Sequence, residues 1–147
     1  MGSLSLPEAG PVYLDANGFI YSVERLEPYA ELLDPLWAAA REQRFEIVCS
    51  ELVILETLVK PLRQGDEKLC DLLKSLLYDS EEVRLLPTTR ATWESAADLR
   101  ARLELETPDA IHAASALTSG STMFVTNDND FRELAGLPVT IMSDLVQ

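Results

Sequence analysis

Two patterns of hydrophobic and polar residues alternate along the chain, and together they predict short strands separated by longer helices. Nearly continuous apolar runs predict strands at residues 12–14, 45–49, 83–86, 122–125 and 138–142. Apolar residues that recur every three or four positions predict helices at residues 17–23, 29–43, 51–59, 66–78, 88–102 and 107–119, with a short one at 131–134. This alternation is typical of a mostly parallel sheet covered by helices on both faces, so we expect a three-layer α/β/α sandwich.

Local signals refine the helix ends. Thr107, Pro108 and Asp109 predict a helix start, with threonine as the N-cap, proline next and an acid in the first turn. Ser50 is a good N-cap for the helix after the second strand, and Pro61 is expected to end that helix.

The length of 147 residues predicts one domain, which we place at residues 11–147 after a flexible lead-in at 1–10. No apolar run approaches about 20 residues, so we expect no transmembrane helix and no membrane partner. The start of the chain lacks the basic and apolar regions of a secretory signal. The two cysteines have no metal-type spacing, which favours a reduced, cytoplasmic protein.

The chain is strongly acidic, with 12 basic and 25 acidic residues and a formal net charge of −13. This charge argues against a protein that coats nucleic acid generally, because such proteins are basic. It does not exclude an enzyme that binds nucleic acid locally. The acids serve either solubility or the binding of a cation, and their positions decide between these functions.

Four acids are expected at the carboxyl edge of the sheet, where ligands bind in folds of this class. Asp15 follows the first strand, Asp128 follows the fourth, and Asp109 and Glu56 lie on helices that begin at this edge. Each has an ordinary explanation: Asp15 and Asp128 suit turns, Asp109 complements a helix dipole, and Glu56 could pair with Lys60. Four clustered carboxylates would repel one another, however, and Mg²⁺ or Mn²⁺ would relieve that repulsion.

Motifs of rival chemistries are missing from the sequence. It has no Walker-type phosphate loop, no dinucleotide fingerprint and no nucleophile elbow. His112 is the single histidine, which excludes the usual zinc clusters. It lies one turn after Asp109 and could reach the site, although a structural role is its ordinary interpretation.

Four segments, in this order, resemble the PIN domain family. They are residues 12–17 (VYLDAN), 50–56 (SELVILE), 107–116 (TPDAIHAASA) and 124–131 (FVTNDNDF). The size and order resemble the small single-domain type found as VapC toxins of toxin–antitoxin pairs. The resemblance implies an Mg²⁺- or Mn²⁺-dependent endoribonuclease that hydrolyses RNA phosphodiester bonds, with an antitoxin as its partner.

The resemblance also implies roles for individual residues. The family's four catalytic, metal-binding acids fall on Asp15, Glu56, Asp109 and Asp128; a further acid falls on Asp130, and supporting polar residues on Asn17 and Thr126. Glu51 competes for the glutamate role, but it lies about 140° away from Glu56 around the helix, so only one of them can face the site. We choose Glu56 because its spacing from the strand end matches the family. The metal would activate a water molecule and neutralise charge on the phosphate.

Partner surfaces are less distinct. Four basic residues near the acid-bearing helices are candidates for RNA binding, although solvated surface charge is their ordinary interpretation: Arg25, Lys60, Arg63 and Lys68. An acidic site would also suit an antitoxin whose arginines reach into it. The leucine-rich segment at 66–78 and Trp37 suggest a homodimer, with core packing as the alternative.

Three other functions stay open at this point. A PIN-like module could use its acidic edge only to dock a protein, and a PIN nuclease could serve housekeeping RNA processing. An aspartyl-phosphate phosphatase is disfavoured because Asn17 stands where such enzymes have a second acid after Asp15. Metal-dependent RNA cleavage separates the nuclease from the docking module.

Overall fold

The fold is built on a parallel sheet, and the computed structural model describes it over residues 2–146. Met1 of the expected lead-in and Gln147 of the expected domain lie outside the described residues. The strand order is β3-β2-β1-β4-β5, and every neighbouring pair is parallel. The strands are β1 (Val12–Leu14), β2 (Ile47–Ser50), β3 (Val83–Leu86), β4 (Met123–Thr126) and β5 (Val139–Ile141). Because β1 lies between β2 and β4, the segments that follow these three strands meet at one edge.

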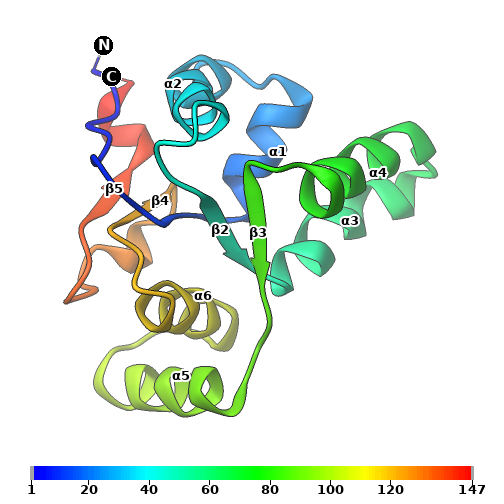
Figure 1. The fold of residues 1–147 in the computed structure, drawn as a ribbon. Coiled ribbons are helices and arrows are strands. Elements are labelled where there is room, and N and C mark those ends of the chain that lie inside the picture. Colours follow the sequence, from blue (N-terminus) through cyan, green and yellow to red (C-terminus); the bar gives the residue numbers. More distant parts are fainter. Residues whose placement is uncertain (1, 147) are drawn as a thin grey trace.

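Helices cover both faces of the sheet, which confirms the expected three-layer sandwich. The helices are α1 (Ala16–Glu24), α2 (Tyr29–Arg41), α3 (Leu52–Gln64), α4 (Glu67–Lys74), α5 (Arg90–Arg102) and α6 (Thr107–Thr118). A π-helical turn, η1 (Ser75–Asp79), continues α4, and two 3₁₀ turns follow later, η2 (Asn129–Phe131) and η3 (Met142–Leu145). Figure 1 shows α1 and α2 on one face of the sheet, α5 and α6 on the other, and the α3–α4 pair beside α1.

A row of buried aromatic rings connects the central strand to the loop after β4. Tyr13 of β1 stacks on Phe124 of β4 with ring centroids 4.9 Å apart, and Phe124 contacts Phe131 of η2 at 4.7 Å. All three side chains are buried. Burial of a large apolar side chain contributes about 1.5–3 kcal/mol, so Phe131 anchors the loop that carries the acids after β4.

Several predicted helix ends differ from the structure. The helix predicted at 29–43 ends at Arg41, and the short helix predicted at 131–134 is instead the turn η2 at Asn129–Phe131. The helix α3 does not end at Pro61 but continues to Gln64, and Gly65, with φ +66°, ends it in the left-handed conformation that glycine adopts most readily. A proline removes one backbone hydrogen-bond donor from a helix, and the packing of the buried face of α3 stabilises the helix beyond Pro61. At the start of α6 the N-cap is Glu106, whose backbone is extended, and Thr107 is already the first helical residue. The Thr107 hydroxyl accepts a hydrogen bond from Arg100 Nη1 at 3.0 Å.

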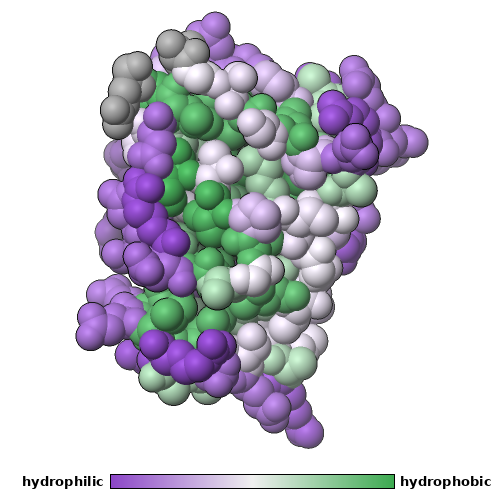
Figure 2. All heavy atoms as spheres, turned by 90° about the vertical axis from the view of Figure 1, so that its left-hand side faces the viewer, coloured by the Kyte–Doolittle hydropathy of each residue, from purple (hydrophilic) through white to green (hydrophobic). Residues whose placement is uncertain are grey.

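Residues 2–10 of the expected lead-in contact the rest of the chain at several points. The Gly2 N–H donates to the Leu145 carbonyl at 2.7 Å, Leu4 is buried in the core, and the Thr122 hydroxyl donates to the Ala9 carbonyl at 2.7 Å. Figure 2 shows the side of the molecule with β5 and the chain ends, where hydrophobic side chains gather in the middle of the face between hydrophilic borders. None of the helices in the described part of the chain has the length and hydrophobicity that crossing a membrane requires.

Candidate metal centre

A pocket of about 270 Å³ lies at the carboxyl edge of the sheet, where the sequence predicts the acids to meet. Its lining contains the four predicted catalytic acids and the predicted supporting amide: Asp15, Glu56, Asp109, Asp128 and Asn17. His112 and Phe131 complete its lining with Ala16 and Ile20. The topology therefore brings together residues from four separate segments of the chain.

Three carboxylates form a tighter cluster within this region. Asp109, Asp128 and Asp130 each offer one carboxylate oxygen, and these three atoms lie within 4.8 Å of one another. Asp130 is exposed, whereas the other two are partly buried. Asp15 and Glu56 line the pocket outside this triplet. The cluster thus includes Asp130, the residue on which the further acid of the family falls.

Thr126 joins the first strand to the loop after the fourth. Its buried hydroxyl donates a hydrogen bond to Asp15 Oδ2 and accepts one from the Asp128 N–H at 3.1 Å. The other Asp15 oxygen accepts from the Gly18 N–H at 3.4 Å, so Asp15 also caps α1. Asp15 therefore caps α1 and also lines the acidic pocket.

The loop after β4 holds its acids through a local turn. The Asp130 N–H donates to Asp128 Oδ1 at 2.8 Å, which is the turn chemistry expected of such a run. Phe131 is buried directly after it. This short, anchored turn places Asp128 and Asp130 beside Asp109, which lies in the first turn of α6.

The electrostatics of the pocket favour a cation. Burial, followed by the charges of Asp128 and Asp130, raises the pKa of Asp109 to about 6. Burial raises the pKa of Asp15 as well, and the hydrogen bond from Thr126 opposes this shift. Among residues 2–146 no lysine or arginine forms a salt bridge with these acids. Clustered carboxylate oxygens without a protein cation fit a hard divalent ion such as Mg²⁺ or Mn²⁺.

Glu56 has a different partner from the one that sequence spacing suggests. Its Oε1 lies 2.6 Å from His112 Nε2, so the partner is not Lys60, which is exposed. Glu51 is exposed at the start of α3, whereas Glu56 lines the pocket. The sequence left the role of His112 open, as a residue that could reach the site but is ordinarily structural. Its signal was its position one turn after Asp109, which puts both side chains on the same face of α6.

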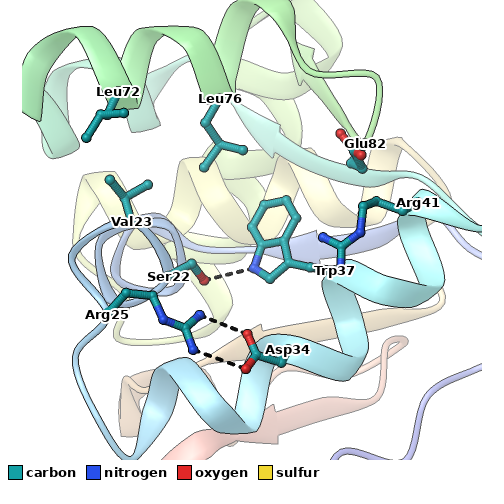
Figure 3. A pocket seen from close by; sticks show the side chains of 9 residues that line it. All are labelled: Ser22, Val23, Arg25, Asp34, Trp37, Arg41, Leu72, Leu76 and Glu82. Carbon is teal, nitrogen blue, oxygen red and sulfur yellow. Dashed lines mark hydrogen bonds and ion pairs between the residues drawn. The ribbon is translucent and has the colours of Figure 1, made fainter.

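The predicted RNA-binding residues do not line the acidic pocket. Arg25 forms a bidentate pair with Asp34 at 2.8 and 3.1 Å, in a separate cavity of about 360 Å³ between α1, α2 and α4. Figure 3 shows this pair and the Trp37 ring, which is buried and also lines that cavity. The remaining three are exposed on α3 and α4: Lys60, Arg63 and Lys68.

A parallel sheet of this order, with a pocket of acids at its carboxyl edge, is the architecture of a PIN domain. The PIN domain family model matches residues 12–137, and the chain belongs to this family. A comparison with curated proteins gives no match.

Solved structures share the fold at low sequence identity. The VapBC2 complex of Rickettsia felis, bound to promoter DNA, contains a chain with 18% identity and a TM-score of 0.69, covering 88% of this chain and 96% of that one. VapC20 of Mycobacterium tuberculosis, a sarcin–ricin loop cleaving toxin, has 20% identity and a TM-score of 0.68, with coverages of 86% and 95%. FitAcB of Neisseria gonorrhoeae has 21% identity and a TM-score of 0.60, with coverages of 87% and 95%.

Proposed function

We propose that this PIN domain is a divalent-metal-dependent endoribonuclease that hydrolyses RNA phosphodiester bonds. The observation that carries the proposal is the Asp109, Asp128 and Asp130 cluster, which shares one edge of the sheet with Asp15 and Glu56. Membership of the PIN family supports it, as does the fold shared with an RNA-cleaving toxin.

The proposed roles follow from where each side chain lies. Asp15, Glu56, Asp109 and Asp128 would hold Mg²⁺ or Mn²⁺, with Asp130 as a further ligand at the exposed side. Such an ion would lower the pKa of a water molecule and neutralise charge that develops on the phosphate. Two residues support this set: Thr126 orients the Asp15 carboxylate, and the exposed amide of Asn17 offers a hydrogen-bond donor to the RNA backbone.

RNA has little general attraction to a chain with a net charge of −13, so the cation would supply much of the local attraction to phosphate. The exposed Lys60, Arg63 and Lys68 would add contacts to the RNA backbone from α3 and α4. Arg25 contributes less to this proposal because its guanidinium is already paired with Asp34.

Cleavage of a mixed pool of single-stranded and structured RNA tests the proposal. The reaction is run with Mn²⁺, with Mg²⁺ and with a chelator. Asp15→Asn removes one proposed ligand, and Glu51→Gln serves as the matched control because Glu51 is exposed. We expect metal-dependent cleavage by the wild type and Glu51→Gln, and none by Asp15→Asn. Cleavage that persists in Asp15→Asn would indicate a contaminant, and no cleavage by the folded wild type would favour the docking module.

We further propose that the chain is the toxin of a cytoplasmic toxin–antitoxin pair. Supporting this, the solved structures of similar fold include VapBC and FitAB assemblies. An antitoxin arginine that enters the pocket would pair with the acids that lack a protein cation. Replacing the antitoxin's arginines should then abolish inhibition of cleavage, whereas unchanged inhibition would refute this form of recognition.

A homodimer is the assembly we propose. In the leucine-rich segment at 66–78, Leu73 and Leu77 are buried, whereas Leu72 is exposed. The neighbouring α3 exposes three apolar side chains on one face, at i, i+4 and i+7. They are Leu55, Val59 and Leu62, with exposures of 65%, 40% and 63%. A second copy would cover this stripe. Sedimentation equilibrium should give twice 16.3 kDa at micromolar concentration, and Leu62→Glu should return the mass to 16.3 kDa, whereas a wild-type monomer would refute the dimer.

A further inference from the structure

A chain of buried hydrogen bonds leads from the central strands to the acidic pocket. The Ser50 N–H, at the end of β2, donates to the Tyr13 hydroxyl at 3.0 Å. That hydroxyl lies 2.6 Å from His112 Nδ1 on α6, and His112 Nε2 lies 2.6 Å from Glu56 Oε1 on α3. Tyr13 is fully buried and His112 is only 3% exposed. The predicted site uses only the last member of this series, Glu56.

The positions of the hydrogens along this series follow from counting donors and acceptors. A tyrosine hydroxyl has one hydrogen to donate, and here it already accepts the hydrogen of Ser50 N–H. Among the contacts of the described residues, His112 Nδ1 is the one remaining partner for the Tyr13 hydrogen. His112 Nδ1 therefore carries no hydrogen of its own, and Nε2 carries the hydrogen that is donated to Glu56.

The other arrangement fails at both ends of the imidazole ring. If Nδ1 carried the hydrogen and Nε2 did not, a bare nitrogen lone pair would face the Glu56 carboxylate at 2.6 Å. The Tyr13 hydroxyl would also bury its hydrogen without an acceptor, which is costly. Both contacts thus disfavour a hydrogen on Nδ1 alone, and the Tyr13 hydrogen, which needs an acceptor, also disfavours hydrogens on both nitrogens.

This tautomer matters for Glu56 because a glutamate side chain is long and flexible. On α3 its neighbours at i−4, i−3 and i+3 are Leu52, Val53 and Val59, none of which offers a hydrogen bond from its side chain. The His112 N–H binds Oε1 and leaves Oε2 free for the pocket. An imidazole with a hydrogen on Nε2 alone carries no charge, so in this tautomer it orients the carboxylate without pairing it with a positive charge.

We propose that Tyr13 fixes His112 in the Nε2–H tautomer, and that His112 thereby acts as a positioning residue that holds the Glu56 carboxylate in place for cation binding. The proposal rests on the proposed function only in taking the acidic pocket as the cation site. Groups that orient metal-binding side chains typically change metal affinity by about 10–100-fold when they are removed.

The first test reads the tautomer directly and needs neither metal nor RNA. Because the chain contains a single histidine, imidazole ¹⁵N labelling gives one pair of nitrogen signals in long-range ¹H–¹⁵N spectra. In the metal-free wild type we expect a protonated Nε2 and an unprotonated Nδ1, resolved from each other. In Tyr13→Phe, which keeps the ring and removes the hydroxyl, only the Glu56 contact still favours the Nε2–H tautomer, so the two signals should move towards each other. Signals in Tyr13→Phe that equal those of the wild type would overturn the role of Tyr13. A protonated Nδ1 or already averaged signals in the wild type would overturn the proposal.

The second test measures Mn²⁺ affinity by titration calorimetry on variants whose folding is checked by circular dichroism. We expect affinity to fall 10–100-fold in His112→Ala and several-fold in Tyr13→Phe, and to recover partly in His112→Gln, whose amide can still donate to Glu56. Tyr78→Phe, at a half-exposed tyrosine on η1, is the matched control and should bind as the wild type does. Equal affinities in all variants would overturn the positioning role.

The two tests separate this inference from the proposed function. If the wild type binds no Mn²⁺, the proposed function fails together with the link from Glu56 to a cation, while the ¹⁵N spectra still decide whether Tyr13 fixes the tautomer. If the wild type binds Mn²⁺ and shows the other tautomer, the proposed function stands and this inference fails.

Discussion

Asp109→Asn should stabilise the metal-free protein and weaken its response to metal. The pKa of this carboxyl is raised to about 6, first by burial and then by the charges of Asp128 and Asp130. At pH 7 the folded protein therefore holds an ionised group where ionisation is unfavourable. Asparagine keeps the shape of the side chain without the charge.

The size of this effect can be worked out from the same shift. A pKa of about 6 in place of 3.8 would correspond to roughly 3 kcal/mol for a group shielded from solvent. Asp109 is only partly buried, so solvent screening reduces the value, and we take about 1 kcal/mol. In a chain of 147 residues this corresponds to a rise in Tm of about 3–4 °C.

The pH dependence has a defined sign. Because the folded pKa lies above the unfolded one, the contribution of Asp109 to stability is fully present below about 3.8 and is lost as pH rises through about 6. The difference in Tm between Asp109→Asn and the wild type should therefore be near zero at pH 4 and reach its full size above pH 6.

Thermal unfolding with chelator and with Mn²⁺ measures this prediction. Asp71→Asn, at an exposed acid on α4, controls for the loss of one charge. With Mn²⁺ at 100 times its Kd, binding would stabilise the wild type by about 2.7 kcal/mol, so the order of the two proteins should reverse. An Asp109→Asn variant that unfolds below the wild type in chelator at pH 7 would refute the reasoning.

Three further substitutions give distinct outcomes. Glu56→Gln should abolish metal-dependent cleavage while Glu51→Gln retains it; cleavage retained by Glu56→Gln would place the glutamate role elsewhere. Thr126→Val should lower the free energy of unfolding by about 1–3 kcal/mol and reduce cleavage, because it removes the hydroxyl that links two segments of the site; denaturant melts and cleavage rates would show it. Gly18→Ala should lower Tm despite alanine's better helix propensity, because a Cβ there would lie 2.2 Å from Leu14 Cδ1; a higher Tm would mean that the core accommodates it.

The sheet could be predicted from the sequence because each strand is covered on both faces. Such strands read as short apolar runs, and the five runs correspond to the five strands of the structure. Helix ends were less predictable. The Thr107 hydroxyl had two possible partners, its own helix start and Arg100, and only the packing of α5 against α6 decides for Arg100.

The acids of the site could be located because the carboxyl ends of parallel strands meet at one edge. The hydrogen bonds that hold them were harder to predict because they join distant segments. Spacing along α3 offers Lys60 to Glu56, whereas the structure pairs Glu56 with His112, 56 residues further along the chain. Tyr13 could not be linked to the site, because a tyrosine in a buried strand is ordinarily explained by the core.

The way these acids are held bears directly on cation binding. Asp15 accepts hydrogen bonds from a threonine hydroxyl and a backbone N–H, and Asp128 accepts one from a backbone N–H. Glu56 lies against the His112 imidazole, which is uncharged in the proposed Nε2–H tautomer. Neutral donors fix the direction of a carboxylate without cancelling its charge, whereas a lysine or arginine would do both. The pocket can therefore be rigid and strongly negative at once. A divalent ion that binds there would relieve the repulsion between the carboxylates. For this reason the metal-free domain should be less stable than its size and core allow, and a cation should stabilise it most where the acids are closest, at Asp109, Asp128 and Asp130.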